Sequence, residues 1–316
     1  MAADPAELGR RLRERDRSAA PAALNLIEDR SDAGRAAAAV LLAEVAPSVL
    51  GGEAPAHLIG ITGPPGAGKS TLLSALLPEW RGARRSVAIL AVDPSSRHSG
   101  GSLLGDRSRI EYDPGDAGIL IRSTAAGARL GGLAAPTREA ADALAAAFDI
   151  VVVETVGVGQ SETDVADVCD TVAVVVQPAS GDVLQFLKAG IMEVPDVLVV
   201  TKADLGDAAA RSRRDLAHGL STVGSSQTPV VAVSSVPPTS GIGELAEAFD
   251  AHRANVDLAA RRLHSRRASA LRELSAEHGE RALRALGGRR EVERLLASRD
   301  PGLSVNDLVA SLEADL

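Results

Sequence analysis

The stretch GPPGAGKST, residues 63–71, is the part of the sequence that decides the fold. It matches the pattern G-x-x-x-x-G-K-S/T, whose glycines let backbone N–H groups curl around phosphate oxygens. It lies between the apolar run HLIGITG, residues 57–63, and the helical pattern STLLSALLPEW, residues 70–80. The N-terminus of that helix adds partial positive charge at the same place. A strand, a glycine-rich loop and a helix in this order predict a site for a nucleoside triphosphate.

Two side chains of this loop are expected to carry its chemistry. Lys69 would reach the β- and γ-phosphates as a point charge, and Ser70 would bind Mg²⁺ through its hydroxyl. The predicted nucleotide-binding loop comprises Gly63, Pro64, Pro65, Gly66, Ala67, Gly68, Lys69, Ser70 and Thr71.

Short, β-branched apolar runs recur outward from the loop. Runs that are apolar at successive positions are typical of strands buried on both faces in a mostly parallel sheet. Helical patterns such as PTREAADALAAAF, residues 136–148, separate several of them. The alternation predicts an α/β fold with a doubly wound, mostly parallel sheet over residues 53–252. The predicted strands lie within residues 57–63, 86–93, 118–123, 149–155, 171–178, 196–204 and 229–235.

Both ends of the chain are predicted to be helical. Residues 1–52 contain AELGRRLRERD and GRAAAAVLLAEVA, which are apolar at helical spacing, before GGEAP breaks the pattern. Residues 253–316 are rich in Ala, Leu and Arg with the same spacing. Because charge runs usually face water, a solvated helix face is expected for the arginines of this segment, with an interaction surface as the alternative. These arginines are Arg261, Arg262, Arg266 and Arg267.

Composition narrows the class of partner. The 316-residue chain has a net charge of −8 and only 2% aromatic residues, which disfavours backbone binding and base stacking, so no nucleic-acid partner is expected. The single cysteine, Cys169, excludes an internal disulfide and a cysteine-cluster metal site. The charged start lacks the apolar core of a signal peptide, and no apolar run reaches about 18 residues. We therefore expect a cytoplasmic protein with no membrane span.

Acidic residues follow three of the predicted strands. Asp93 and Glu154 each end a strand, and Asp204 follows another within TKAD. Ligands of such sheets lie at the carboxyl edge. Glu154, followed by a glycine turn, is expected to be a Mg²⁺-sensing carboxylate beside a switch loop. Asp204 can accept both N–H groups of a guanine edge while the stem of Lys202 covers the base. Each acid taken singly is equally typical of a helix N-cap or of the surface.

These residues give the sequence a resemblance to the SIMIBI class of P-loop GTPases. Within that class it resembles the MeaB-like GTPase chaperones of adenosylcobalamin-dependent acyl-CoA mutases. The resemblance spans the predicted GTPase domain, and the helical ends resemble the family's N-terminal segment and C-terminal dimerisation arm, which implies a homodimer. The motifs that carry it are DPSSRHSGGSLLGDRSRI (93–110), IRSTAAGARLGGLAAPTRE (121–139), ETVGVGQSE (154–162), GDVLQFLKAGIMEVPD (181–196) and TKAD (201–204).

The resemblance implies roles for individual residues. Those implied in Mg²⁺ handling are Ser70, Asp93, Asp106 and Glu154. Those implied at the guanine base are Thr201, Lys202, Asp204, Ser234 and Ser235, where Thr201 stands in place of the family's usual Asn. The implied catalytic set is Lys69, Asp93, Asp106, Glu154 and Gln160, and three of these, Asp93, Asp106 and Gln160, are alternatives for positioning the attacking water. Residues 177–188 correspond to the family's third switch loop.

Lysine occurs at only three positions in a chain with 34 lysines and arginines. An ammonium and a guanidinium differ in chemistry, so retained lysines indicate a specific use. Lys69 and Lys202 already have one, which leaves Lys188. With Asp182 and Gln185 at three-residue spacing, Lys188 lines one stripe if the segment is helical. We expect this stripe to couple nucleotide state to the partner. A solvated face is the alternative.

The resemblance implies hydrolysis of GTP to GDP with Mg²⁺, slow alone and stimulated by the partner. The implied partner is an adenosylcobalamin-dependent acyl-CoA mutase, such as methylmalonyl-CoA mutase, whose cofactor loading is gated and which is protected or reactivated. Three alternatives remain. They are a nucleotide-dependent small-molecule kinase or transport ATPase, a metallochaperone GTPase, and a nucleotide-switched interaction protein without turnover.

Overall fold

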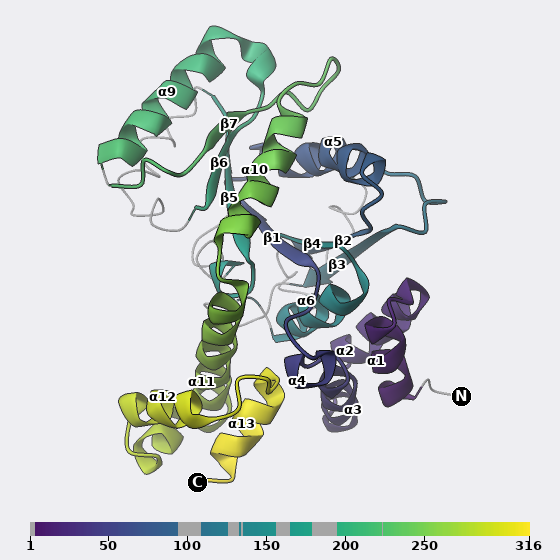
Figure 1. Cartoon of the computed structure of the whole chain (residues 1–316), viewed down its shortest axis with the longest axis vertical. Coiled ribbons are helices and arrows are strands. Elements are labelled where there is room, and N and C mark those ends of the chain that lie inside the picture. Colours follow the sequence, from purple (N-terminus) through teal and green to yellow (C-terminus); the bar gives the residue numbers. More distant parts are fainter. Residues whose placement is uncertain are drawn as a thin grey trace, which may run out of the picture. The chain divides into compact units, whose positions relative to one another are not determined.

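The computed structural model describes residues 4–93, 109–125, 133, 135–155, 165–178, 195–222 and 224–316. The chain divides into two compact units (Figure 1). Unit 1 consists of Met1–Pro55, Asp142–Ala147 and Asp257–Leu316, and unit 2 of Ala56–Ala141 and Phe148–Val256. The two helical ends of the chain therefore belong to one unit, and the segment between them forms the other.

Unit 2 is built on a seven-stranded sheet in which all the paired strands are parallel. Its order is β3-β2-β4-β1-β5-β6-β7 (Figure 1). The strands are β1 (His57–Thr62), β2 (Val87–Asp93), β3 (Ile119–Ala125), β4 (Ile150–Glu154), β5 (Thr171–Val176), β6 (Val197–Val200) and β7 (Val230–Ala232). The predicted α/β fold with a doubly wound parallel sheet is confirmed. Because β1 lies between β4 and β5, the segments that follow these three strands leave the sheet side by side.

Helices cover both faces of this sheet, which is why its strands read as continuous apolar runs. On one face, α5 (Lys69–Gly82) and α10 (Ile242–Asn255) share a core in which the rings of Trp80 and Phe249 lie 6.4 Å apart. On the other, α9 (Asp207–Thr222) packs Leu216 and Leu220 against β5 and β6. The remaining elements are η3 (Val165–Asp167), η5 (Ala203–Leu205) and α6 (Ala135–Ala147), which passes from unit 2 to unit 1 at Asp142.

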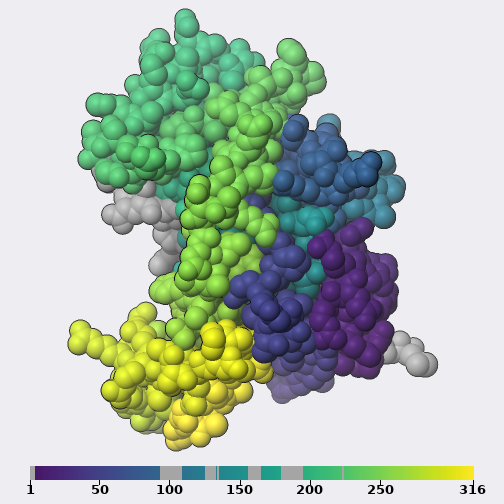
Figure 2. Space-filling view, viewed as in Figure 1, coloured from purple at the N-terminus to yellow at the C-terminus, as the bar shows by residue number. Residues whose placement is uncertain are grey.

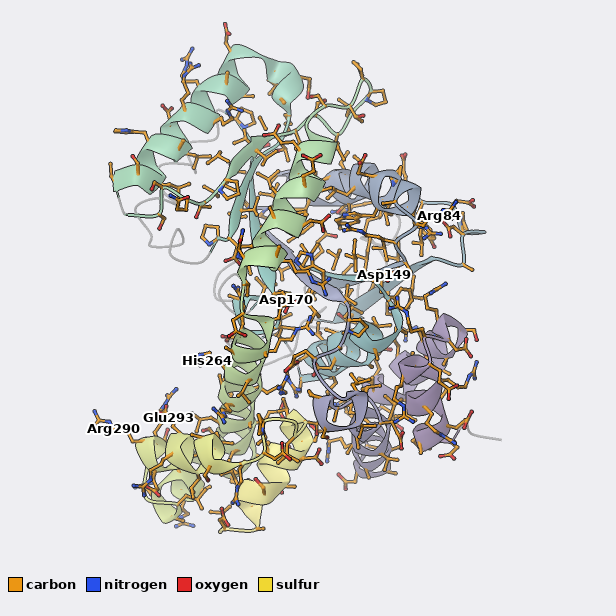
Figure 3. The ribbon with its side chains drawn as sticks, viewed as in Figure 1. Arg84, Asp149, Asp170, His264, Arg290 and Glu293 are labelled. Carbon is orange, nitrogen blue, oxygen red and sulfur yellow. The ribbon has the colours of Figure 1, made fainter. Side chains whose placement is uncertain are left out.

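An aspartate precedes three of the strands and caps a neighbouring one at the amino edge of the sheet. Each carboxylate accepts a hydrogen bond from a backbone N–H at or just before the start of the adjacent strand. The pairs are Asp149 with Ser86 (2.8 Å), Asp170 with Leu58 (2.9 Å) and Asp196 with Val172 (2.9 Å). Figure 3 labels two of these acids, Asp149 and Asp170. These bonds hold the strands in register at the amino edge.

A chain of polar contacts, buried at His57 and Thr171, also lies at this edge. His57 Nε2 lies 2.7 Å from Thr171 Oγ1, which lies 2.8 Å from Nδ1 of His252 on α10. His252 Nε2 in turn lies 3.1 Å from Asp196 Oδ1. Burial lowers the pKa of His57 from 6.5 to about 4, against the opposing charge of Asp170. His57 is therefore a neutral ring at pH 7 that takes part in packing and hydrogen bonding.

The regular structure of unit 1, among its described residues, consists of helices only. Its elements, besides the end of α6, are α1 (Pro5–Arg13), η1 (Arg17–Ala19), α2 (Ala20–Glu28), α3 (Asp32–Ala43), α4 (Pro47–Leu50), α11 (Leu258–Ala285), α12 (Arg289–Ser298) and α13 (Val305–Glu313). Helix α11 is interrupted at Gly279, where φ is 69°. Leu274, Leu296 and Leu308 belong to the apolar core shared by α11, α12 and α13. Figure 2 shows α12 and α13, in yellow, as one packed body.

The prediction of a solvated arginine face on α11 is wrong for Arg262, and Arg266 is also largely covered. Arg262 is 7% exposed and donates to the carbonyl oxygen of Ala54 at 2.6 Å. Arg266 makes a bidentate pair with Glu53 at 2.8 and 2.9 Å. The charge pattern alone does not reveal that the end of the N-terminal segment returns to α11 and supplies a carboxylate and a carbonyl. Arginine suits such bidentate contacts.

One stretch of unit 1, Asp32–Leu50, is long and apolar enough by length and composition to cross a membrane. Those two criteria are weak evidence, because a helix packed in a protein core meets them too. Here α3 ends at Ala43 and α4 begins only at Pro47. Leu41 and Leu42 are buried where α3 contacts α1 and α2. The stretch is therefore two helices, the longer of which packs within unit 1.

Replacing His57 with glutamine should flatten the acid side of the stability profile. The folded chain, with a pKa of about 4 at His57, binds the proton more weakly than the unfolded chain at 6.5. The contribution of His57 to stability is therefore complete above pH 6.5 and is lost as the pH falls towards 4. The loss amounts to about 3 kcal/mol. Urea unfolding at both ends of this range measures it.

The matched control is His218→Gln, because His218 lies exposed on α9. This control should leave the pH dependence of the unfolding free energy as it is in the wild type. If His57→Gln also left it unchanged, His57 would not be held neutral by burial.

Candidate nucleotide-binding site

The loop between β1 and α5 begins with a backbone geometry that requires glycine. Gly63 has a φ of 141°, and a Cβ on it would lie 2.1 Å from the carbonyl oxygen of Val175 in β5. Any side chain here would push the loop away from the sheet. Gly68, at the N-cap of α5, also has a left-handed backbone, with a φ of 92°. The loop can therefore curl tightly at the carboxyl edge of the sheet and lead directly into a helix.

Lys69 lies folded back into this loop. It is only 8% exposed, and its Nζ donates to the carbonyl oxygens of Gly63 at 2.6 Å and Pro64 at 3.2 Å. Carbonyl oxygens hold the ammonium without neutralising its charge. The charge thus lies at the N-terminus of α5, where the helix dipole is also positive. The loop is suited to an anion with several oxygens, such as a phosphate chain.

Ser70 and Glu154 form the second part of the site. Ser70 Oγ donates to Glu154 Oε1 at 2.9 Å. Glu154 ends β4, is 6% exposed and lies opposite Ile61 in the register of β1 and β4. A carboxylate and a hydroxyl are hard oxygen ligands of the kind that Mg²⁺ takes together with phosphates. The residues present therefore fit a Mg²⁺ ion, which Ser70 and Glu154 would hold.

Thr201 connects the TKAD motif, residues 201–204, to the loop between β1 and α5. It follows β6, is 3% exposed and donates through Oγ1 to the carbonyl oxygen of Ala67 at 2.7 Å. The same oxygen lies 3.1 Å from the carbonyl oxygen of Val176. The hydroxyl of Thr201 is thus engaged with backbone on two neighbouring segments. The hydrogen bond to Ala67 ties TKAD to the loop.

Lys202 has an unusual backbone for a residue with a side chain. Its φ is 54°, in the left-handed region that non-glycine residues seldom occupy. Its Nζ contacts Gln177 Oε1 and lies 3.5 Å from the carbonyl oxygen of Gly66. Lys202 therefore contacts both the loop and the residue that directly follows β5. Such strained conformations often occur at functional sites.

Asp204 lies exposed in η5, beside the segment that follows β7. Its Oδ1 accepts a hydrogen bond from Ser234 Oγ at 3.2 Å. Ser235 Oγ is buried and makes no hydrogen bond to the described residues. Leu205 and Val236, next to these residues in sequence, are 53% and 47% exposed. An acid with apolar neighbours of this kind suits a flat base that carries N–H donors.

The parallel sheet brings the described members of the predicted site to one edge. The loop follows β1, Glu154 ends β4, Thr201 follows β6 and Ser234 follows β7. Asp93 ends β2, next to β4, so its backbone lies at the same edge. Thr71 lies exposed in the first turn of α5. The predicted residues Asp106, Gln160, Asp182, Gln185 and Lys188, and the side chain of Asp93, lie outside the described part of the chain.

Sequence reasoning gave no individual role to three residues of this site, although Gln177 begins the predicted third switch loop, residues 177–188. Gln177 contacts Lys202, and Thr155 Oγ1 donates to Thr62 Oγ1 at 2.8 Å. Thr62 directly precedes the loop and Thr155 directly follows Glu154. That proximity in sequence was the only signal, because no pattern indicates that the two hydroxyls meet.

Comparison with known proteins identifies related chains. A family model described as "Methylmalonyl Co-A mutase-associated GTPase MeaB" matches residues 20–287. A Mycobacterium bovis protein named "Probable GTPase" is 38% identical over 246 residues, covering 75% of this chain and 71% of that one. A Caenorhabditis elegans protein named "Methylmalonic aciduria type A homolog, mitochondrial" is 40% identical over 217 residues, covering 66% and 54%.

A Pyrococcus horikoshii relative is 46% identical over 199 residues, covering 63% of this chain and 60% of the relative's length. Among solved structures, the crystal structure of an LAO/AO transport system kinase has a TM-score of 0.64 at 28% identity. That match covers 98% of this chain and 96% of the other, so it includes the helical ends. These similarities agree with the P-loop, the parallel sheet and a guanine nucleotide as ligand.

Replacing Ser70 with alanine should weaken the Mg²⁺-dependent part of nucleotide binding. The variant loses a hydroxyl ligand and removes the donor that Glu154 Oε1 accepts from. We expect the Mg²⁺ concentration that gives half-maximal tightening of nucleotide binding to rise about tenfold. The affinity for nucleotide in EDTA should stay nearly unchanged. Fluorescence titration of a labelled nucleotide measures both. The control is Ser221→Ala, an exposed hydroxyl on α9. Equal Mg²⁺ dependence in the Ser70 variant and the wild type would remove Ser70 from the metal site.

Proposed function

The chain belongs to the MeaB family of methylmalonyl-CoA mutase-associated GTPases, and from this premise we propose that it hydrolyses GTP with Mg²⁺ as a G-protein chaperone. Its client is an adenosylcobalamin-dependent acyl-CoA mutase. The observation that carries the proposal is the contact of Ser70 with Glu154 beside Lys69 at the head of α5. An ammonium, a hydroxyl and a carboxylate grouped at a glycine-rich loop are the parts that triphosphate hydrolysis needs.

In this proposal the loop and Lys69 supply most of the positive charge that stabilises the phosphates. Backbone N–H groups of the glycine-rich loop would bind the phosphates, and Lys69 would leave its carbonyl partners for the β- and γ-phosphates. These groups neutralise the charge that develops on the transferring phosphoryl group as water attacks in line. Mg²⁺, when bound by Ser70 and Glu154, supplies further positive charge at the same phosphates.

The water-positioning residue is one of three proposed alternatives, Asp93, Asp106 and Gln160. We propose that Asp93 and Asp106 also take part in Mg²⁺ handling. Asp93 ends the strand next to Glu154, which supports its inclusion. In the proposal, the guanine base is bound by Asp204 and Lys202, with Ser234 and Ser235 beside it. Hydrolysis is slow in the isolated chain and faster when the partner reorders the switch segments.

The proposed client is methylmalonyl-CoA mutase or a close relative. The family description and the name of the Caenorhabditis elegans relative support this choice. In the proposed cycle, nucleotide state gates the loading of adenosylcobalamin onto the mutase, and the chaperone protects or reactivates its client. Residues 177–188 relay that state, with Asp182, Gln185 and Lys188 as the coupling stripe.

The helical ends have structural roles in the proposal. Residues 1–52 are an N-terminal segment, residues 53–252 the GTPase domain and residues 253–316 a dimerisation arm, in a cytoplasmic homodimer. The apolar core shared by α11, α12 and α13 supports an arm with a defined shape. Arg290 and Glu293 on α12 are exposed side chains of that arm (Figure 3).

Two rival functions have less support. The similar crystal structure is that of a protein called a transport system kinase, but TKAD in this chain, with Asp204 bonded to Ser234, is suited to guanine. A metallochaperone needs thiolates or imidazoles. In the described parts of the chain, the one group of three possible metal ligands is Glu277, His278 and Glu313, which are exposed and include a single imidazole. Exposed acidic groups of this kind are common without an ion.

Mutase-stimulated hydrolysis tests the proposed function. Phosphate release from GTP by the purified chain should be slow alone and should rise at least about tenfold with methylmalonyl-CoA mutase present. Lys188→Ala should abolish most of that rise while leaving the affinity for GTP unchanged. The matched control is Arg213→Ala, which removes an exposed positive charge on α9. Rapid hydrolysis indifferent to any acyl-CoA mutase would refute the chaperone role, and full stimulation of the Lys188 variant would leave that residue a solvated lysine.

A further inference from the structure

We propose that Thr62 and Thr155 are positioning residues that set the reach of Glu154 towards Ser70. Their hydroxyls form a latch, defined here as the Thr155–Thr62 hydrogen bond, between the start of the phosphate loop and the exit of β4. The proposal rests on the proposed function, because it concerns the Mg²⁺ site of the same GTPase.

The latch is a direct and fully buried contact. Thr155 Oγ1 donates to Thr62 Oγ1 at 2.8 Å, and each residue is only 1% exposed. The backbone N–H of Thr155 also donates to the carbonyl oxygen of Ile61 at 3.0 Å. Side chain and backbone therefore bind Thr155 to the last two residues of β1. Because the contact is shielded from solvent, water does not compete for either hydroxyl.

The latch lies where the two strands stop pairing. The ladder between β1 and β4 ends at the pair Ile61 and Glu154. Beyond this pair, β1 leads into the phosphate loop at Gly63, and β4 leads through Thr155 into the segment that begins at residue 156. The Thr155–Thr62 hydrogen bond thus joins the residues that directly follow the last pair between β4 and β1. Glu154 is adjacent in sequence to one of its partners.

The end of β1 is held from both sides by these contacts. On the β5 side, Gly63 lies so close to the Val175 carbonyl oxygen that a Cβ would come within 2.1 Å of it. On the β4 side, the latch holds Thr62. The distance between Ser70, which β1 carries through the loop, and Glu154, which β4 carries directly, depends on that second contact. A shift of β4 by a few tenths of an ångström would change the geometry in which the two oxygens meet a cation.

A purely structural pair of threonines makes a different prediction from a latch. If the two hydroxyls only satisfy each other, replacing both threonines with valine removes donor and acceptor together. The double variant then has both the stability and the Mg²⁺ dependence of the wild type. In a latch the double replacement recovers stability but not position, because valine side chains have no directional bond. The readout that separates the two cases is Mg²⁺ dependence measured apart from stability.

The experiment titrates the full-length chain with Mg²⁺ while a fluorescent GDP analogue reports binding. Thr155→Val and Thr62→Val should each raise the Mg²⁺ concentration for half-maximal tightening about fivefold to tenfold, with GDP affinity in EDTA within about twofold of wild type. Thr155→Ser keeps the hydroxyl and should stay within about twofold of wild type. The double variant Thr62→Val/Thr155→Val should regain the wild-type thermal midpoint and keep the raised Mg²⁺ requirement.

A matched control comes from another buried threonine pair. Thr124 Oγ1 and Thr137 Oγ1 lie 3.5 Å apart on β3 and α6, and Thr137 is fully buried. Thr137→Val should lower the thermal midpoint without changing the Mg²⁺ requirement. A wild-type Mg²⁺ requirement in Thr155→Val, or its return in the double variant, would overturn the latch alone. A wild-type chain that binds GDP with no response to Mg²⁺ would overturn the proposed metal site and the latch together.

Discussion

The hydrogen bond from the Ser70 hydroxyl to the Glu154 carboxylate, 2.9 Å long, is the contact on which the rest of the proposed site depends. The two residues are 84 positions apart in the chain and meet only because β4 lies beside β1. In a strand order that separated β4 from β1, the carboxylate would end at a distance from the phosphate loop. The order β2-β4-β1-β5 is therefore a functional constraint, since it places Asp93, Glu154, the loop and Gln177 on successive strands of one edge.

The two edges of the sheet have different physical tasks. At the amino edge, aspartates cap neighbouring strands, and the buried, neutral ring of His57 hydrogen-bonds to Thr171. These bonds need no ligand and hold the strands in register. At the carboxyl edge, Lys69 and Lys202 bond to backbone carbonyls or to Gln177, contacts that a nucleotide can replace. A rigid scaffold with exchangeable contacts at one edge is how loops become binding sites.

The sequence predicted the strands well because their burial on both faces leaves a plain pattern of apolar runs. It also predicted the loop, because Gly63, Lys69 and Ser70 follow from how phosphates are bound. Strand order was beyond it, since periodicity records burial and not neighbours. The charge-run interpretation failed at Arg262 because a carbonyl that returns from residue 54 leaves no local trace. The Thr62–Thr155 pair was equally hidden, because it depends on the register of β1 against β4.

Guanine selectivity is the most direct measure of what this site recognises, because the TKAD motif that holds Asp204 is tied to the loop through the Thr201 hydroxyl. The carboxylate of Asp204 would accept from two N–H donors of guanine, whereas an asparagine amide would donate to the extra carbonyl of xanthine. Equilibrium binding of GTP, ATP and XTP to the wild type and to Asp204→Asn should show GTP preferred over ATP by at least about 100-fold in the wild type. The variant should lose a similar factor for GTP and prefer XTP. Equal binding of ATP and GTP by the wild type, unchanged in the variant, would contradict a guanine site at TKAD.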